Sequence, residues 1–150
     1  MNIVKKKNFL FIKNNWAKIS AEIIYSEIEK IHLKKETVNI ALTGGRTSSK
    51  IYIHLNKLLK KNKKKINFCL GDERYLSNKS KLSNSFSINK VLLNYKNKDH
   101  KFFTPNTKNK ISKEILAYEK QIDKIDILLL TLGDDGHIAS IFPKFNKKKN

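Results

Sequence analysis

The chain reads Asp126-Ile127-Leu128-Leu129-Leu130-Thr131-Leu132 in its most apolar run, and Gly133-Asp134-Asp135-Gly136-His137 follows directly. A near-continuous apolar run of this length is typical of a parallel strand that is covered on both faces of a sheet. We therefore expect residues 126–132 to form a central strand. The change to glycine and charged residues at Gly133 marks the point where this strand ends.

The same pattern of an apolar run followed by glycine occurs twice more. Thr37–Leu42 and Ile66–Leu70 read as buried strands, and apolar residues at helical spacing separate them. This alternation predicts an α/β fold in three layers, α/β/α, with a mainly parallel, Rossmann-like sheet built from right-handed βαβ units. We expect helices within residues 16–31, 51–59, 84–93 and 111–122, the last with Ile111, Ile115, Tyr118 and Ile122 on one face, and short strands at Phe9–Ile12 and Phe102–Phe103.

Polar turns that contain glycine follow three of the predicted strands. They are Thr43-Gly44-Gly45-Arg46-Thr47-Ser48, Gly71-Asp72-Glu73-Arg74 and Gly133-Asp134-Asp135-Gly136-His137. In an open parallel sheet, ligands bind outside the carboxyl ends of the strands. The three turns are therefore predicted to converge on one crevice.

Charge and composition narrow the possible partners. The 150 residues fit a single domain, 1–150, with a formal net charge of +19. Of the 32 basic residues, 30 are lysines, which we interpret as lysines placed wherever solvent tolerates them. We expect no nucleic-acid partner, because the chain lacks a recognition helix, arginine clusters and aromatic stacking motifs. The two arginines, Arg46 and Arg74, carry more information, since only arginine gives bidentate recognition of phosphate or carboxylate.

Other functions are disfavoured by what the sequence lacks. No apolar stretch is long enough to cross a membrane, and no signal peptide is recognised, so we expect a cytoplasmic location and no membrane partner. Cys69 is the single cysteine, and no cluster of His, Cys and Asp has the spacing of metal ligands. We therefore expect neither a disulfide nor a metal site. The oligomeric state stays open.

The first turn has the composition of a phosphate-binding turn. Gly44 and Gly45 allow close approach of the backbone to a ligand, and Thr47, Ser48 or Ser49 can cap the helix that follows. The N-terminus of a helix favours an anion, and Arg46 adds a cation beside it. The alternative is an ordinary glycine turn with a Ser/Thr cap. The sequence matches neither a Walker motif nor the dinucleotide fingerprint.

The second and third turns carry groups suited to catalysis. Arg74 can hold a phosphate or carboxylate or stabilise an oxyanion, and Asp72 can bind sugar hydroxyls or position an acid–base partner. His137 suits a general base at neutral pH, with Asp135 setting its tautomer. The alternatives are that residues 72–74 are three charged side chains in solvent, and that His137 only forms hydrogen bonds within its own loop.

Four motifs together resemble those of the 6-phosphogluconolactonase family. Residues 132–143, Leu-Gly-Asp-Asp-Gly-His-Ile-Ala-Ser-Ile-Phe-Pro, resemble its Gly-x-Asp-Gly-His-Thr-Ala-Ser-Leu-Phe-Pro signature. Gly71–Leu76, Ser83-Asn84 with Leu92-Leu93, and Thr43–Thr47 are similar to its other segments, in the same order. The related glucosamine-6-phosphate deaminases carry a Glu in the segment after Asp-Gly-His and tend to have Tyr where this chain has Arg74.

The resemblance implies hydrolysis of 6-phosphoglucono-1,5-lactone to 6-phosphogluconate in the pentose phosphate pathway, without a cofactor. In that scheme His137 is the general base, Asp135 orients it, and Arg74 steadies the substrate and the oxyanion. Gly44, Gly45, Arg46 and Thr47 would hold the 6-phosphate, and Asp72 would add polar contacts. A deaminase or isomerase acting on an amino-sugar phosphate, and a non-catalytic protein that binds sugar phosphate, are the alternatives.

The resemblance also implies that part of the fold is missing from this sequence. Family members continue past the Phe-Pro of residues 142–143 into further strands and helices. We therefore expect an incomplete domain, with an exposed sheet edge and exposed apolar surface.

Overall fold

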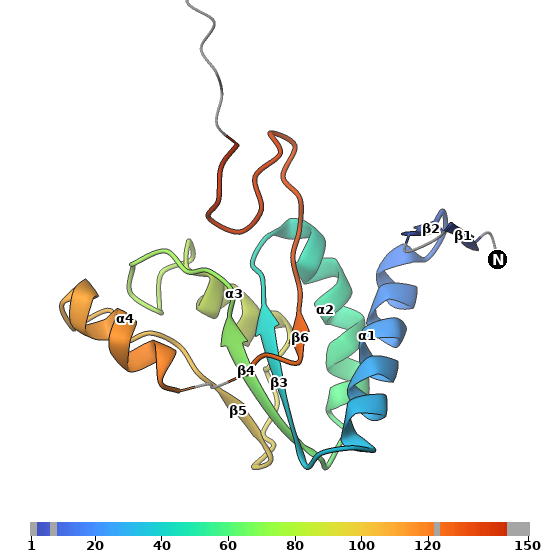
Figure 1. The fold of residues 1–150 in the computed structure, drawn as a ribbon, viewed down its shortest axis with the longest axis horizontal. Helices are drawn as coiled ribbons and strands as arrows, with labels where there is room; N and C mark the ends of the chain where they lie inside the picture. The colour runs from blue at the N-terminus through green and yellow to red at the C-terminus, as the bar shows by residue number, and fades with distance from the viewer. Residues whose placement is uncertain (1–2, 7–8, 122–123, 144–150) are drawn as a thin grey trace, which may run out of the picture.

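The structure is a computed structural model that describes residues 3–6, 9–121 and 124–143. Strands and helices alternate along most of the chain, as Figure 1 shows. The elements are β1 (Ile3–Lys6), β2 (Phe9–Ile12), α1 (Trp16–His32), β3 (Thr37–Leu42), α2 (Arg46–Leu59), β4 (Lys65–Leu70), α3 (Asn84–Val91), β5 (His100–Phe102), α4 (Ile111–Glu119) and β6 (Ile127–Leu128).

The main sheet is parallel, with the strand order β5-β4-β3-β6. β3 and β4 pair along their whole length, from Thr37 opposite Lys65 to Leu42 opposite Leu70. The predicted strand at Phe9–Ile12 exists as β2, but it pairs with β1 in a separate antiparallel hairpin. The carboxyl ends of β3, β4 and β6 therefore lie at the same end of the main sheet (Figure 1).

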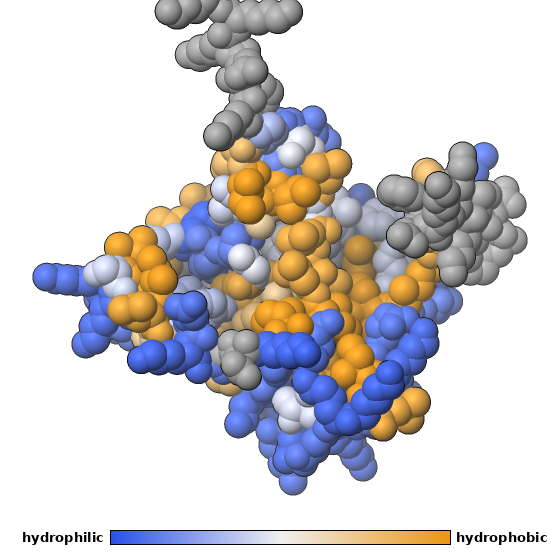
Figure 2. Space-filling view, in the orientation of Figure 1, coloured by the Kyte–Doolittle hydropathy of each residue, from blue (hydrophilic) through white to orange (hydrophobic). Residues whose placement is uncertain are grey.

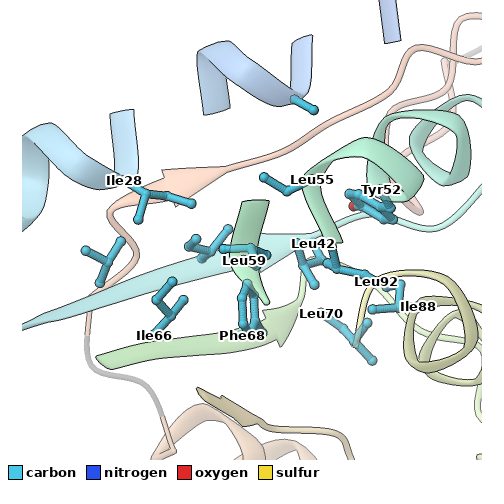
Figure 3. Packing of buried hydrophobic residues seen from close by; sticks show 13 residues of the cluster. Ile28, Leu42, Tyr52, Leu55, Leu59, Ile66, Phe68, Leu70, Ile88 and Leu92 are labelled. Atoms are coloured by element: carbon cyan, nitrogen blue, oxygen red, sulfur yellow. The ribbon is translucent and has the colours of Figure 1, made fainter. Parts of the chain in front are cut away.

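The hydrophobic core lies between one face of the sheet and the helices α1, α2 and α3. We call this side the α1–α3 face. Alternate residues of β3 and β4 point to it, because side chains alternate between the faces of a strand. Figure 3 shows how they pack against the helices. The buried cluster contains Val38, Ile40, Leu42, Ile66, Phe68 and Leu70 from the sheet with Ala21, Ile28, Tyr52, Leu55, Leu59, Ile88 and Leu92 from the helical side.

α4 lies on the opposite side of the sheet, the α4 face, where Tyr118 lines a groove together with Ala41 and Cys69. The Tyr118 hydroxyl accepts a hydrogen bond from Leu70 N at 2.7 Å and donates one to Phe103 O at 3.3 Å. Helices on both faces confirm the predicted α/β/α arrangement. In a right-handed crossover, the direction of the path across the sheet decides which face the helix lies on. The path β3-α2-β4-α3-β5 crosses the sheet in one direction and β5-α4-β6 crosses back in the other, so α4 lies on the face opposite α2 and α3.

The prediction of a central strand at residues 126–132 is wrong. β6 spans only Ile127–Leu128 and lies at the edge of the described sheet, with β3 as its partner. Ile127 and Leu129 pack against the core, whereas Leu128, Leu130 and Leu132 are 55%, 49% and 71% exposed. Within the described residues, one side of the run thus packs against the core, and the leucines of its other side are largely exposed, where Figure 2 shows an apolar band on the surface.

The apolar face predicted for the last helix is present, because Ile111, Ile115 and Tyr118 line one pocket. Ile111 and Ile115 are nevertheless exposed, while Glu114 is buried at 3% exposed. Glu114 is buried because its carboxylate accepts hydrogen bonds from Asn106 N at 2.8 Å and from Asn109 Nδ2 at 2.6 Å. The predicted contribution of Ile122 lies outside the described residues. Within the described part of the chain, no helix is both long and apolar enough to cross a membrane.

Candidate active site

The first turn joins β3 to α2 and is fixed by close packing on both sides. A Cβ atom at Gly44 would overlap the Asn84 side chain, and Gly45 has a φ of 107°, a conformation that favours glycine. The buried Tyr52 hydroxyl of α2 accepts from Thr43 N at 3.2 Å and donates to Thr43 O at 2.9 Å. The turn is therefore held in one position relative to the helix that follows.

The predicted Ser/Thr cap of α2 is not formed. The helix begins at Arg46, its N-cap is Gly45, and no side chain caps it. Ser48 Oγ donates instead to the carbonyls of Gly44 at 2.8 Å and Gly45 at 2.9 Å, and Ser49 Oγ donates to Gly45 at 2.8 Å. With no side-chain oxygen as their acceptor, the N–H groups of the first turn of α2 suit an anion.

The second turn is organised around the carboxylate of Glu73. It accepts hydrogen bonds from Asn84 N and Ser85 N, both at 2.8 Å, and from Ser83 Oγ at 2.9 Å. It also accepts from Arg74 N at 2.8 Å. Burial opposes ionisation of Glu73, but the N–H groups of Ser85, Asn84 and Arg74 outweigh it and hold its pKa below the usual range. Glu73 thereby ties the second turn to the start of α3.

Both arginines line one cavity of about 500 Å³, which we call the cationic hollow. Arg74 crosses towards the segment before α3 and donates from Nη1 to Leu82 O at 2.8 Å. The lining contains four cationic side chains and no acidic one, so the hollow suits an anion. Its lining residues are Gly45, Arg46, Ser49, Lys50, Arg74, Lys81, Leu82, Ser83, Asn84 and Ser87.

The third turn belongs to a segment that we call the His137 loop, residues 133–143. Its turn is closed by hydrogen bonds from Gly136 N to Gly133 O at 2.9 Å and from Gly133 N to His137 O at 2.8 Å. The Asp135 carboxylate contacts His137 Nδ1, and this hydrogen bond is the main cause that lowers the Asp135 pKa. The Phe142 ring stacks on the imidazole at a centroid distance of 5.2 Å.

Asp72 connects the turns. Ser140 Oγ of the His137 loop donates to Asp72 Oδ2 at 3.0 Å. Asn84 Nδ2 donates to Asp72 O at 3.0 Å, and the same Asn84 side chain lies against Gly44. One chain of contacts thus runs from the first turn through Asn84 and Asp72 to the His137 loop.

The strand order explains why the site lies here. β3 lies between β4 and β6 in the sheet. The chain passes from β3 through α2 to β4 on one side, and it reaches β6 on the other side only later, from the opposite direction. Such a reversal is a topological switch point, and crevices open there between the loops that follow the two strands. Those loops are the first turn and the His137 loop, which Figure 1 shows above the strand ends.

The structure places the predicted site residues in two groups, one at the cationic hollow and one at the His137 loop and the second turn. Gly45, Arg46 and Arg74 line the cationic hollow, and Gly44 lies beside it against Asn84. Thr47 is exposed on the first turn of α2 and is not part of that lining. The remaining three, Asp72, Asp135 and His137, lie on the side where the His137 loop contacts the second turn.

Sequence reasoning assigned no role to four polar residues of this region. Lys50 follows Arg46 by four positions on a helix and shares its face, so helical spacing could have identified it. Lys81, and the connecting roles of Asn84 and Ser140, have no such local signal, because these side chains reach partners distant in sequence.

The strand order, the crossovers and the polar turns at the strand ends define a doubly wound α/β protein. Residues 13–150 match the family described as glucosamine-6-phosphate isomerases/6-phosphogluconolactonase, and the chain belongs to this family.

Individual relatives agree with this assignment. The 6-phosphogluconolactonase of Thermotoga maritima is 32% identical over 144 residues, which are 93% of this chain and 65% of the relative. A crystal structure of 6-phosphogluconolactonase from that organism matches at a TM-score of 0.76 and 30% identity, over 88% of this chain and 62% of that one. The glucosamine-6-phosphate deaminase of Clostridium tetani is 33% identical, over 87% of this chain and 57% of the relative. The chain thus spans less than two thirds of the length of these relatives.

Proposed function

We propose that this chain carries the lactone-hydrolysing site of a 6-phosphogluconolactonase, which converts 6-phosphoglucono-1,5-lactone to 6-phosphogluconate in the pentose phosphate pathway. The observation that carries the proposal is a cationic hollow and a His–Asp pair on neighbouring strand ends, joined through Asp72 and Ser140. The hollow suits the 6-phosphate, and the pair suits a general base. The relative from Thermotoga maritima supports the choice of substrate.

In the proposed reaction, His137 takes a proton from water, and the water oxygen attacks the carbonyl carbon of the lactone. The resulting oxyanion collapses, the bond between that carbon and the ring oxygen breaks, and His137 returns the proton to the leaving ring oxygen. Asp135 holds the imidazole at Nδ1, which leaves Nε2 for the proton transfer. A lactone is an activated ester, so the proposal needs neither a metal nor an organic cofactor.

Binding of the substrate is assigned to the first two turns. In the proposal, Gly44, Gly45, Arg46 and Thr47 hold the 6-phosphate at the start of α2, where N–H groups and cations favour it. Arg74 steadies the substrate and the oxyanion, since a guanidinium carries N–H groups beyond the one bonded to Leu82. Asp72, which holds Asn84 and Ser140, contributes polar contacts and keeps the two halves together.

Turnover of the lactone tests the role of His137. The purified 150-residue chain is assayed for 6-phosphogluconate formation above the spontaneous rate. We expect His137→Ala to lower kcat/KM by at least about a hundredfold, the usual contribution of a general base. His54→Ala, which changes a half-buried histidine of α2, is the matched control and should retain activity. Undiminished turnover by His137→Ala would remove His137 from its role.

Binding of 6-phosphogluconate tests the hollow separately. Calorimetric titration should show weaker binding to Arg46→Ala by about tenfold, because one charged hydrogen bond to phosphate is lost. Lys57→Ala removes a cation from the last turn of the same helix and should bind like the unchanged chain. Equal weakening by both variants would mean that only overall charge matters.

Two other functions stay as alternatives. Similarity to the Clostridium tetani deaminase favours an amino-sugar phosphate as substrate, and release of ammonia from glucosamine 6-phosphate would identify that activity. The segment Ser140–Pro143 lacks the Glu of that group, and Arg74 replaces its Tyr, so we favour the lactone. Binding of 6-phosphogluconate without turnover would instead indicate a non-catalytic protein that binds sugar phosphate. The cytoplasmic location stays a prediction from the sequence.

A further inference from the structure

Lys50 of α2 lines two cavities. One is the cationic hollow, and the other is a cavity of about 370 Å³ that we call the Trp16 pocket. α1 and α2 lie side by side and begin at the same end of the molecule, so the first turn of α1 lies near Lys50 (Figure 1). Lys50 is the one residue that the two linings share. The lining of the Trp16 pocket is formed by Asn15, Trp16, Ala17, Lys18, Lys50, Ile53 and His54.

The Lys50 ammonium lies over an aromatic ring and not against a carboxylate. Its Nζ is 6.0 Å from the centroid of the Trp16 ring, at the outer limit of a cation–π contact. Neither cavity has an acidic residue in its lining. Lys18 of the same pocket pairs with Glu22 at 3.9 Å, whereas the Lys50 ammonium has no salt bridge or hydrogen bond among the described residues. Lys50 thus keeps its three N–H donors for another partner.

The position of Lys50 beside Arg46 favours an anion as that partner. The two residues are four positions apart on α2, and like charges at this spacing repel each other. An anion bound between them removes that repulsion. A phosphate monoester carries nearly two negative charges at neutral pH and three acceptor oxygens, so two cations can bind it together.

A comparison of magnitudes decides which partner Lys50 prefers. A cation–π contact at an exposed site changes an affinity by about two- to fivefold. A hydrogen bond from an ammonium to phosphate is worth at least about tenfold. A phosphate in the cationic hollow therefore competes successfully with the Trp16 ring for the Lys50 ammonium.

We propose that Lys50 is a further phosphate-binding residue, which turns from the Trp16 ring to the 6-phosphate when the substrate binds. Selection of a phosphorylated substrate over an unphosphorylated one rests in part on this contact. Trp16 competes with the phosphate for Lys50 and thereby lowers the affinity. The identity of the ligand rests on the proposed function.

The test titrates the 150-residue chain with 6-phosphogluconate and follows tryptophan fluorescence. Trp16 is the single tryptophan, so the signal reports on its surroundings alone. We expect a saturable change in fluorescence with the same Kd that calorimetry gives, because the ammonium leaves the ring as the phosphate binds. Gluconate, which lacks the phosphate, should cause no change at the same concentrations.

Replacement of each partner should change the affinity in opposite directions. Lys50→Met should weaken binding at least about tenfold and abolish the fluorescence change. Lys57→Met, in the last turn of the same helix, is the matched control and should behave like the unchanged chain. Trp16→Leu removes the competitor and should tighten binding about two- to fivefold in calorimetry. In a Lys50→Met background, Trp16→Leu should have no effect on binding.

Four results would overturn the proposal. They are absence of 6-phosphogluconate binding, equal binding by Lys50→Met and Lys57→Met, an equal fluorescence change with gluconate, and failure of Trp16→Leu to tighten binding. Circular dichroism checks that Trp16→Leu is folded; if it is not, the comparison of Lys50→Met with Lys57→Met decides, because Lys50 is exposed.

Failure of this inference and failure of the proposed function are distinguishable. If the expected changes in binding occur without turnover of the lactone, the role of Lys50 stands and the proposed hydrolysis does not. If the chain hydrolyses the lactone and Lys50→Met binds 6-phosphogluconate as tightly as Lys57→Met, only the role of Lys50 is refuted.

Discussion

The cationic hollow and the His137 loop lie at the same end of the sheet but are held in different ways. The walls of the hollow are bound to each other by the Glu73 carboxylate, by Tyr52 and by the close contact of Gly44 with Asn84. The His137 loop is closed mainly by its own hydrogen bonds and is joined to the second turn by Ser140 and Asp72.

Exposure reflects the same difference. Ser83, Asn84 and Ser85 beside the hollow are buried, whereas Ile141 and Phe142 of the loop are 77% and 63% exposed. The walls of the cationic hollow are therefore held by buried contacts, and the His137 loop rests on few contacts. Variants that act on one part and not on the other can test this comparison.

Glu73→Ala should have the largest effect. It removes the common acceptor of Ser83 Oγ and of the N–H groups of Asn84 and Ser85, and we expect a loss of about 3 kcal/mol in the free energy of unfolding. Urea denaturation measures it. Glu119→Ala, at an exposed position of α4, should change stability by less than about 0.5 kcal/mol. Equal losses would show that Glu73 does not organise the hollow.

Gly44→Ala should have the next largest effect on the free energy of unfolding. The added Cβ would overlap Asn84, and overpacking of a well-packed site costs about 2 kcal/mol. Gly71→Ala is the control, because its Cβ would meet its nearest atom, Leu42 O, at 3.4 Å. Thermal and urea unfolding measure the stability of both variants. In an Asn84→Ala background Gly44→Ala should cost clearly less, and an unchanged cost would contradict the contact.

Acidification should weaken the hollow through Glu73. The folded-state pKa of Glu73 lies below its usual 4.5, so its stabilisation is present above pH 4.5 and is lost as the pH falls through the folded pKa. The free energy of unfolding should therefore decrease with pH below 4.5, and Glu73→Gln should flatten that decrease. Asp135→Asn, in the exposed His137 loop, should leave the stability profile nearly unchanged, although the Asp135 pKa is also lowered.

Ser140→Ala should have the smallest effect on stability, about 0.5 kcal/mol, because it removes one exposed hydrogen bond. Its effect on dynamics should be local. Hydrogen exchange within residues 133–143 should speed up several-fold, while the amides around Asn84 stay protected. Ser26→Ala on the exposed side of α1 should alter neither region. Faster exchange in both regions would mean that the loop and the hollow form one unit.

The sequence by itself determined most of the elements and the positions of the polar turns. Helical and strand spacing are local properties, so the helix within residues 16–31, the strands Thr37–Leu42 and Ile66–Leu70, and the turns after them could be identified from nearby residues. The glycines and the arginines were recognisable for the same reason, because turn conformation and phosphate recognition depend on residue type.

Only the tertiary structure decided where β6 lies, which residue of α4 is buried, and how the turns are joined. An apolar run does not reveal its neighbours, and residues 126–132 therefore predicted a central strand where the described sheet has an edge. Glu114 is buried because Asn106 and Asn109 supply donors, and Asn84 and Ser140 join the turns through Asp72. Such contacts depend on strand order and crossover handedness, which bring distant segments together and which local spacing does not encode.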